Sequence, residues 1–247
     1  MSMRRQFPLT IEALIERDRR VQVLLGDIGV FGFRHVFERH QKNILNLGIL
    51  EQATVGVAAG LAIGGDIPVV HTIAPFLIER AYEQLKIDFG YQQLPGNFVS
   101  VGGSYDYAAL GCTHHCPADL ALMLNIPNFE IVVPGTASEF DSLFNERYAG
   151  SNPTYFRLSE FENSSGHDVK FGSNTVIKRG KKSGRVVIAV GPMLDRVIQA
   201  TADQDVTVLY CTTLYPFDCE TVVDLAPEHI CMVLPSYSSA GYDLLGP

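Results

Sequence analysis

The sequence contains no long hydrophobic run. Of its 247 residues 47% are hydrophobic and the mean hydropathy is +0.12, yet glycine, proline or charged residues interrupt every apolar stretch. None approaches the roughly 20 apolar residues that a membrane-spanning helix needs, so we expect no membrane span. Arg4 and Arg5 are not followed by the apolar core of a secretory signal, and secretion is therefore not expected.

Positive charge and cysteine are also scarce. The chain has 19 Lys and Arg residues against 27 Asp and Glu residues, a formal net charge of −8 and a pI of about 5.3. An acidic surface repels phosphate backbones, so nucleic acid is not an expected partner. The five cysteines are odd in number and irregularly spaced, which does not indicate a disulfide framework. We expect a cytoplasmic protein whose cysteines are mostly small core residues.

Apolar segments of strand length alternate with helix-length segments along most of the chain. The apolar segments are rich in Val, Ile and Phe with little alternation, as in strands covered on both faces. Strands are predicted at residues 21–26, 67–72, 98–102, 129–133 and 154–158. Helices are predicted around 11–15 and over 49–63, 76–91 and 136–148. Thr136 and Glu139 form a capping box for the last of them. This alternation predicts an α/β fold with a parallel sheet and helices on both faces.

A polar segment divides the chain into two parts. We predict a first domain over 1–162 and a linker over 163–183, rich in Ser, Gly, Asn and Lys, with one short strand at 175–178. A second α/β unit is predicted over 184–247, with strands at 185–190, 206–210 and 230–234 and a helix at 193–202. A free-standing α/β domain normally has about 100 residues or more. We therefore expect this unit to be abbreviated or completed by a partner.

The densest local signal is the segment Asn46 to Gln52. A glycine leads directly into a helix of Ala, Val and Gly that carries Glu51 in its first turn. Such a glutamate commonly complements the helix dipole, which requires no function. The helix is, however, apolar on nearly all sides, so we expect it to be buried together with its N-terminus. A buried carboxyl group must be paired, or raised in pKa and protonated, and it suits the ring nitrogen of a cofactor.

Several segments together resemble the pyrimidine-binding domain of transketolases. They are the segment around Glu51, residues 55–62, residues 76–84, the Thr113-His114 pair and residues 119–128, in register from about Arg4 to Ser159. From Arg185 the chain resembles the start of that family's C-terminal domain. The resemblance implies a parallel-sheet domain that binds the aminopyrimidine of thiamine diphosphate, followed by a smaller, abbreviated α/β C-terminal domain.

The resemblance also implies which residues contact the cofactor. Glu51 would hydrogen-bond a ring nitrogen of the aminopyrimidine and thereby activate the cofactor, and burial would raise its pKa toward the working pH. Phe76 belongs to the segment that stacks on this ring. Ile73 stands where the family usually carries a stacking phenylalanine, so an apolar contact would replace the aromatic one. Asp27 matches an aspartate near the cofactor.

Three further residues are candidates for substrate binding. His114 matches a histidine that faces the substrate hydroxyl groups, although a capping or core histidine fits the sequence equally well. His71 lies at the end of a predicted strand, and it either lines the same cleft or is a satisfied loop histidine. Arg4 matches an arginine on the phosphate side of the substrate. By contrast, Leu110 stands in place of a sugar-binding aspartate, and Gly102 and Glu160 replace two basic phosphate-binding residues. These changes predict a non-phosphorylated ketose or a 2-oxo acid as substrate.

The sequence contains no Gly-Asp-Gly motif, which in the family holds the diphosphate through Mg²⁺ or Ca²⁺. We therefore expect no metal site on this chain and a partner subunit, transketolase-like and N-terminal in type, that carries the diphosphate-binding domain. The chain would be the C-terminal subunit of a two-component enzyme transferring a two-carbon ketol or acyl unit. We expect it to self-associate through the pyrimidine domain, giving a two-fold heterotetramer.

Two other functions stay open: a beta-type subunit of a 2-oxo acid decarboxylase or dehydrogenase, and a degenerate scaffold or regulatory partner without activity.

Two local patterns do not indicate a further binding site. The cysteines and histidines of residues 112–116 are too closely spaced to surround one zinc ion. Gly26, Gly29 and Gly32 do not have the spacing of a dinucleotide-binding loop.

Overall fold

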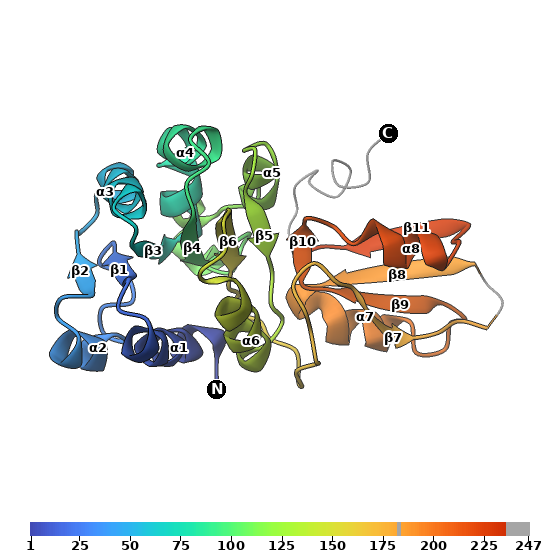
Figure 1. Ribbon diagram of the computed structural model, residues 1–247. Coiled ribbons are helices and arrows are strands. Elements are labelled where there is room, and N and C mark those ends of the chain that lie inside the picture. Colours follow the sequence, from blue (N-terminus) through green and yellow to red (C-terminus); the bar gives the residue numbers. More distant parts are fainter. Residues whose placement is uncertain (182–183, 236–247) are drawn as a thin grey trace.

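The computed structural model describes residues 1–181 and 184–235. Within them a seven-stranded, mostly parallel sheet is followed by a smaller four-stranded sheet (Figure 1). The α/β fold predicted from the sequence is therefore confirmed. In the described part of the chain no helix is long and apolar enough to cross a membrane.

The large sheet has the strand order β10-β5-β6-β4-β3-β1-β2, and only β10 is antiparallel to its neighbour. Its strands are β1 (Val21–Leu25), β2 (Ile44–Asn46), β3 (Ile67–Ile73), β4 (Gly96–Val101), β5 (Glu130–Val132), β6 (Pro153–Arg157) and β10 (Thr213–Tyr215). The small sheet has the order β11-β8-β9-β7, with β7 antiparallel to β9. Its strands are β7 (Thr175–Lys178), β8 (Arg185–Val190), β9 (Thr207–Cys211) and β11 (His229–Val233).

Helices cover both faces of the large sheet, and each face has its own apolar core (Figure 1). One face carries α1 (Met3–Arg17), α2 (Arg34–Arg39) and α6 (Ala137–Arg147). The other carries α3 (Glu51–Ile63), α4 (Tyr82–Gln84) and α5 (Asp119–Leu124). The small sheet is accompanied by α7 (Leu194–Ala200) and α8 (Cys219–Asp224).

Three features differ from the sequence-based expectation. The predicted helix over 76–91 is instead two π-helical turns, Pro75–Glu79 and Leu85–Tyr91, on either side of α4. The helix expected to be buried, α3, leaves one face exposed, at Gln52, Ala53, Gly56, Val57 and Gly60. Finally, β10 follows β9 in the chain but joins the large sheet beside β5.

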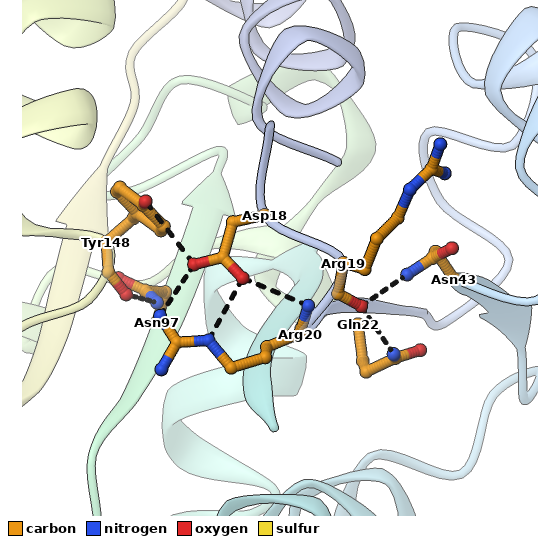
Figure 2. Close-up of polar contacts among 7 residues, drawn as sticks. All are labelled: Asp18, Arg19, Arg20, Gln22, Asn43, Asn97 and Tyr148. Atoms are coloured by element: carbon orange, nitrogen blue, oxygen red, sulfur yellow. Dashed lines mark hydrogen bonds and ion pairs between the residues drawn. The ribbon is translucent and has the colours of Figure 1, made fainter. Parts of the chain in front are cut away.

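Polar contacts hold in place the residues that directly precede β1. Figure 2 shows the Asp18 carboxylate accepting hydrogen bonds from the backbone and side chain of Arg20, with the Tyr148 hydroxyl 3.4 Å away. Beside it, Asn43 donates to the carbonyl of Arg19 at 3.0 Å. The hydrogen bonds from Arg20 hold the pKa of Asp18 below its usual range.

Replacing Asp18 with Asn should flatten the pH dependence of stability in acid. A carboxyl group whose pKa is lowered by folding stabilises the protein above its unfolded-state pKa, and this contribution is lost as the pH falls through the lower, folded-state value. We therefore expect the free energy of unfolding, measured in urea, to fall less steeply for Asp18→Asn than for the wild type below about pH 4. Parallel curves for the two proteins would contradict this account.

Candidate active site

The candidate residues follow the carboxyl ends of neighbouring parallel strands. The strand register places Leu25 at the end of β1 between Asn46 of β2 and His71 of β3. On the other side of β3, Ile73 pairs with Val101 of β4. Ligands of open parallel sheets bind along this edge. The register thus brings together loops that are far apart in the sequence.

Glu51 begins α3 and is 2% exposed, although the helix shows one face to solvent. Its Oε2 accepts a hydrogen bond from Nη1 of Arg80 at 2.7 Å. Its Oε1 is buried and has no hydrogen-bond partner among the described residues. The preceding Ile49 and Leu50 are 63% and 59% exposed. The structure therefore pairs one carboxylate oxygen and leaves the other free, beside an exposed apolar surface.

The side chains of Arg80, Phe76 and His114 form a contiguous row beside this carboxylate. The guanidinium carbon of Arg80 lies 4.3 Å from the centre of the Phe76 ring. The Phe76 ring in turn contacts the His114 ring edge to face, with centroids 5.4 Å apart. The Nδ1 atom of His114 lies 2.9 Å from the Thr113 hydroxyl. Glu51, Phe76 and His114, predicted separately from the sequence, are thus joined through Arg80.

Ile73 ends β3 and is 6% exposed. A side chain added at Gly102, which has a positive φ, would approach Ile73 Cγ2 at 3.2 Å and the Tyr107 ring at 2.4 Å. The loop after β4 therefore passes directly over Ile73 only because position 102 has no side chain. The apolar contact between Ile73 and a cofactor stays a prediction.

His71 is 1% exposed, and the direction of its hydrogen bonds is fixed by its surroundings. Nδ1 lies 2.8 Å from the carbonyl oxygen of Val99, which can only accept, so Nδ1 carries the proton. Burial lowers the pKa of His71 to about 4, and the ring is neutral near pH 7. Nε2 is then an acceptor, and it faces Gly29, where an added Cβ would lie only 3.0 Å from it.

A cavity of about 690 Å³ brings His71 and Arg4 together with Glu160 and the exposed ring of Phe31. Arg4 donates to the Tyr107 hydroxyl at 3.3 Å and lies 3.8 Å from the Glu160 carboxylate. The Tyr107 hydroxyl donates to Glu160 at 3.1 Å. Burial raises the pKa of Tyr107 to about 12. The positive charge of Arg4 is therefore offset by an adjacent carboxylate.

Asp27 belongs neither to the residues beside Glu51 nor to the cavity around His71 and Arg4, but it restrains the segment that leads to Glu51. Its backbone N–H donates to Asn46 Oδ1 at 3.0 Å, and Asn46 Nδ2 donates to its carboxylate at 2.8 Å. Asn46 Oδ1 also accepts from the N–H of Gly48 at 3.2 Å. Asp27 is exposed and has a φ of 63°. A direct contact between Asp27 and a cofactor stays a prediction.

Sequence reasoning missed two residues of this region. Arg80 follows Phe76 by four residues, and this helical spacing was the available signal for their contact. Tyr107 lies in an irregular loop that carries no such periodicity. Elsewhere, ligand atoms of Glu12, Glu16 and His40 lie within 4.8 Å of one another. Both carboxylates there already bind Arg39, at 2.7 and 2.9 Å.

Comparisons with known proteins identify the family. Residues 1–163 match the family described as "Transketolase, pyrimidine binding domain". The chain belongs to this family, whose enzymes use thiamine diphosphate, and the resemblance seen in the sequence is confirmed. Over 93% of its length it is 40% identical to an "Uncharacterized 33.6 kDa protein in fasciation locus" of Rhodococcoides fascians, of which it covers 74%.

Other relatives carry more specific names. The chain is 31% identical over 72% of its length to the B component of the apulose-4-phosphate transketolase of Actinobacillus succinogenes, and it spans 60% of that protein. It is 28% identical to "1-deoxy-D-xylulose-5-phosphate synthase" of a Thermotoga species, of which it spans 37%. The chain therefore corresponds to only part of these relatives.

Solved structures show the same fold. "Split gene transketolase, inactive beta4 tetramer" superimposes with a TM-score of 0.84 at 25% identity, over 99% of this chain and 85% of that one. Transketolase from Campylobacter jejuni superimposes with a TM-score of 0.82 at 17% identity, over 99% of this chain and 41% of that one.

Proposed function

We propose that the chain is the C-terminal subunit of a two-component, thiamine-diphosphate-dependent transketolase-like enzyme that transfers a two-carbon ketol or acyl unit. The observation that carries this proposal is Glu51 Oε1, which is buried and lacks a partner in the described structure. A buried acceptor without a hydrogen bond is costly. A protonated ring nitrogen of the cofactor would satisfy it, so the residues present fit the pyrimidine half of thiamine diphosphate.

When bound, thiamine diphosphate supplies an electron sink for breaking a carbon–carbon bond next to a carbonyl group. Glu51 would share a proton with the cofactor ring through Oε1. Phe76 and Ile73 would provide apolar contacts, with Asp27 fixing the loop beside them. His71, neutral and with Nε2 as acceptor, and His114 would bind substrate hydroxyl groups.

The diphosphate and its Mg²⁺ or Ca²⁺ would be held by an N-terminal transketolase-like partner, because this chain has no Gly-Asp-Gly motif. Two relatives are each named as one component of an apulose-4-phosphate transketolase, and a similar structure is that of a "Split gene transketolase". These names support such a division between two chains. The exposed Ile49 and Leu50 beside Glu51 would lie against this partner.

The exposed face of α3 suits contact with a second copy of the chain. Ala53, Gly56, Val57 and Gly60 repeat along it at helical spacing. Their small side chains permit close approach of two helices, and burying them would remove apolar surface from water. Two copies paired in this way, each with one partner subunit, give a two-fold heterotetramer. We place the assembly in the cytoplasm, where the five free cysteines would stay reduced.

Reconstitution tests this proposal. The chain should be co-expressed with a protein that carries the Gly-Asp-Gly motif, preferably from a neighbouring reading frame. We expect the pair to bind thiamine diphosphate and transfer a two-carbon unit, and the separate chain to do neither. A stable pair that does not bind thiamine diphosphate would show that the proposal is wrong.

For the substrate we propose a non-phosphorylated ketose or a 2-oxo acid. Arg4 already contacts Glu160 and Tyr107. A substrate phosphate would therefore have to compete with the Glu160 carboxylate for the Arg4 guanidinium group. We expect the reconstituted pair to use such substrates faster than ketose phosphates, and Glu160→Gln to raise activity on the phosphates. High wild-type activity on ketose phosphates alone would contradict the substrate assignment and leave the cofactor chemistry intact.

A further inference from the structure

The two carboxylate oxygens of Glu51 have different surroundings. Oε2 is held by Arg80 at 2.7 Å, whereas Oε1 is buried without a partner among the described residues. Fixing one oxygen of a carboxylate restricts rotation of the whole group. The orientation of Oε1 is therefore determined by a residue that need not touch the cofactor.

Arg80 is itself restrained by its position on the chain. It directly follows the π-helical turn Pro75–Glu79, and its N–H donates to the carbonyl of Pro75 at 3.1 Å. Its guanidinium carbon lies 4.3 Å from the centre of the Phe76 ring. A planar guanidinium group can stack on a ring and donate hydrogen bonds in its own plane at the same time. A lysine ammonium group cannot combine the two contacts in this geometry.

We propose that Arg80 is a positioning residue: it holds Oε2 of Glu51 so that Oε1 points toward the bound aminopyrimidine. The inference rests on the proposed function, because it concerns the same site. Its contact with Phe76 also couples the carboxylate to the ring that touches His114. The Arg80 side chain is 37% exposed while that of Glu51 is 2% exposed, so the pair lies where the buried carboxylate meets the open edge of the sheet.

A double-mutant cycle in the reconstituted pair tests this inference. We expect Arg80→Met to weaken thiamine diphosphate binding about tenfold and to lower kcat, with little change in substrate KM. Arg80→Lys should recover part of the loss, because it keeps the charge. In a Glu51→Ala background, which removes the carboxylate that Arg80 holds, the added Arg80→Met should change cofactor affinity by less than about twofold, because coupled residues are not additive.

Arg39→Met is the matched control. Arg39 also forms ion pairs with glutamates, but on α1, away from the sheet edge. We expect it to leave cofactor affinity and kcat unchanged. Thermal unfolding of both variants excludes a general loss of structure as the cause of any difference.

A crystal structure of the Arg80→Met chain without cofactor supplies a second readout. We expect the Glu51 side chain to take a different rotamer or to be disordered. Wild-type affinity and kcat in Arg80→Met, or full additivity with Glu51→Ala, would overturn the role of Arg80 and leave the proposed function standing. Failure of the wild-type pair to bind thiamine diphosphate would overturn both.

Discussion

Replacing Glu51 with Gln should lower kcat of the reconstituted pair by about 10²- to 10⁴-fold, the range over which a positioned acid or base contributes. The amide has nearly the same volume and can still bond to Arg80 through its oxygen. It has no carboxyl proton to share with a cofactor ring. The pair should therefore assemble normally, and steady-state kinetics together with the mass of the complex in solution would measure the two properties separately.

Glu16→Gln is the matched control for this variant. Glu16 is also ion-paired with an arginine, at 2.9 Å, but lies on α1. We expect wild-type activity from it. The comparison also distinguishes the proposed enzyme from a non-catalytic scaffold, the alternative function that the sequence left open, since a scaffold has no activity that depends on Glu51. Equal kcat values for Glu51→Gln and the wild type would exclude Glu51 from the chemistry.

The sequence predicts well those elements that have a regular spacing of apolar residues or a characteristic capping residue. The strand predicted at residues 67–72 was visible as a short segment rich in Val and Ile, and it is observed as β3 (Ile67–Ile73). Half of the capping box was also confirmed, because Thr136 Oγ1 accepts from the N–H of Glu139 at 3.3 Å, whereas the Glu139 carboxylate accepts from the N–H of Gly135 at 2.8 Å. Once strands and helices alternate, the carboxyl edge of the sheet is the expected binding edge.

Features that depend on tertiary contacts were not visible. The apolar composition of α3 predicted a buried helix, but composition does not say whether a neighbour lies within the same chain, and Val57 is 41% exposed. The three residues of β10 are too few for a periodic signal, and their pairing with β5 spans some 80 residues of sequence. The bond from Arg80 to Glu51 likewise joins segments 29 residues apart.

A buried ion pair was also not visible in the sequence, and breaking it has the largest effect on stability that we expect. Arg157 ends β6 and Asp119 begins α5, with 1% and 0% of the two residues exposed. Arg157 Nε donates to Asp119 Oδ2 at 2.6 Å, and Tyr155 donates to the same oxygen at 3.1 Å. Burial alone would lower the pKa of Arg157, but the Asp119 carboxylate outweighs it and the pKa is raised.

Arg157 also supports the loop that carries His114. A side chain added at Gly103 would lie 2.6 Å from the guanidinium group, so the loop rests directly on it. Ser104 and Cys116 close the base of this loop with two backbone hydrogen bonds, at 2.9 and 2.8 Å. Loss of Arg157 should therefore disturb the histidine as well as the core.

Replacing Arg157 with Met should lower the free energy of unfolding by about 3–5 kcal/mol, because it leaves the Asp119 carboxylate buried without its counter-ion. The double variant Arg157→Met with Asp119→Leu should recover most of this loss, since two apolar side chains replace both charges. Urea unfolding of the two variants and the wild type would measure both effects. A loss below about 1 kcal/mol in the single variant, the level of an exposed ion pair, would contradict the assignment of Arg157 as the buried counter-ion.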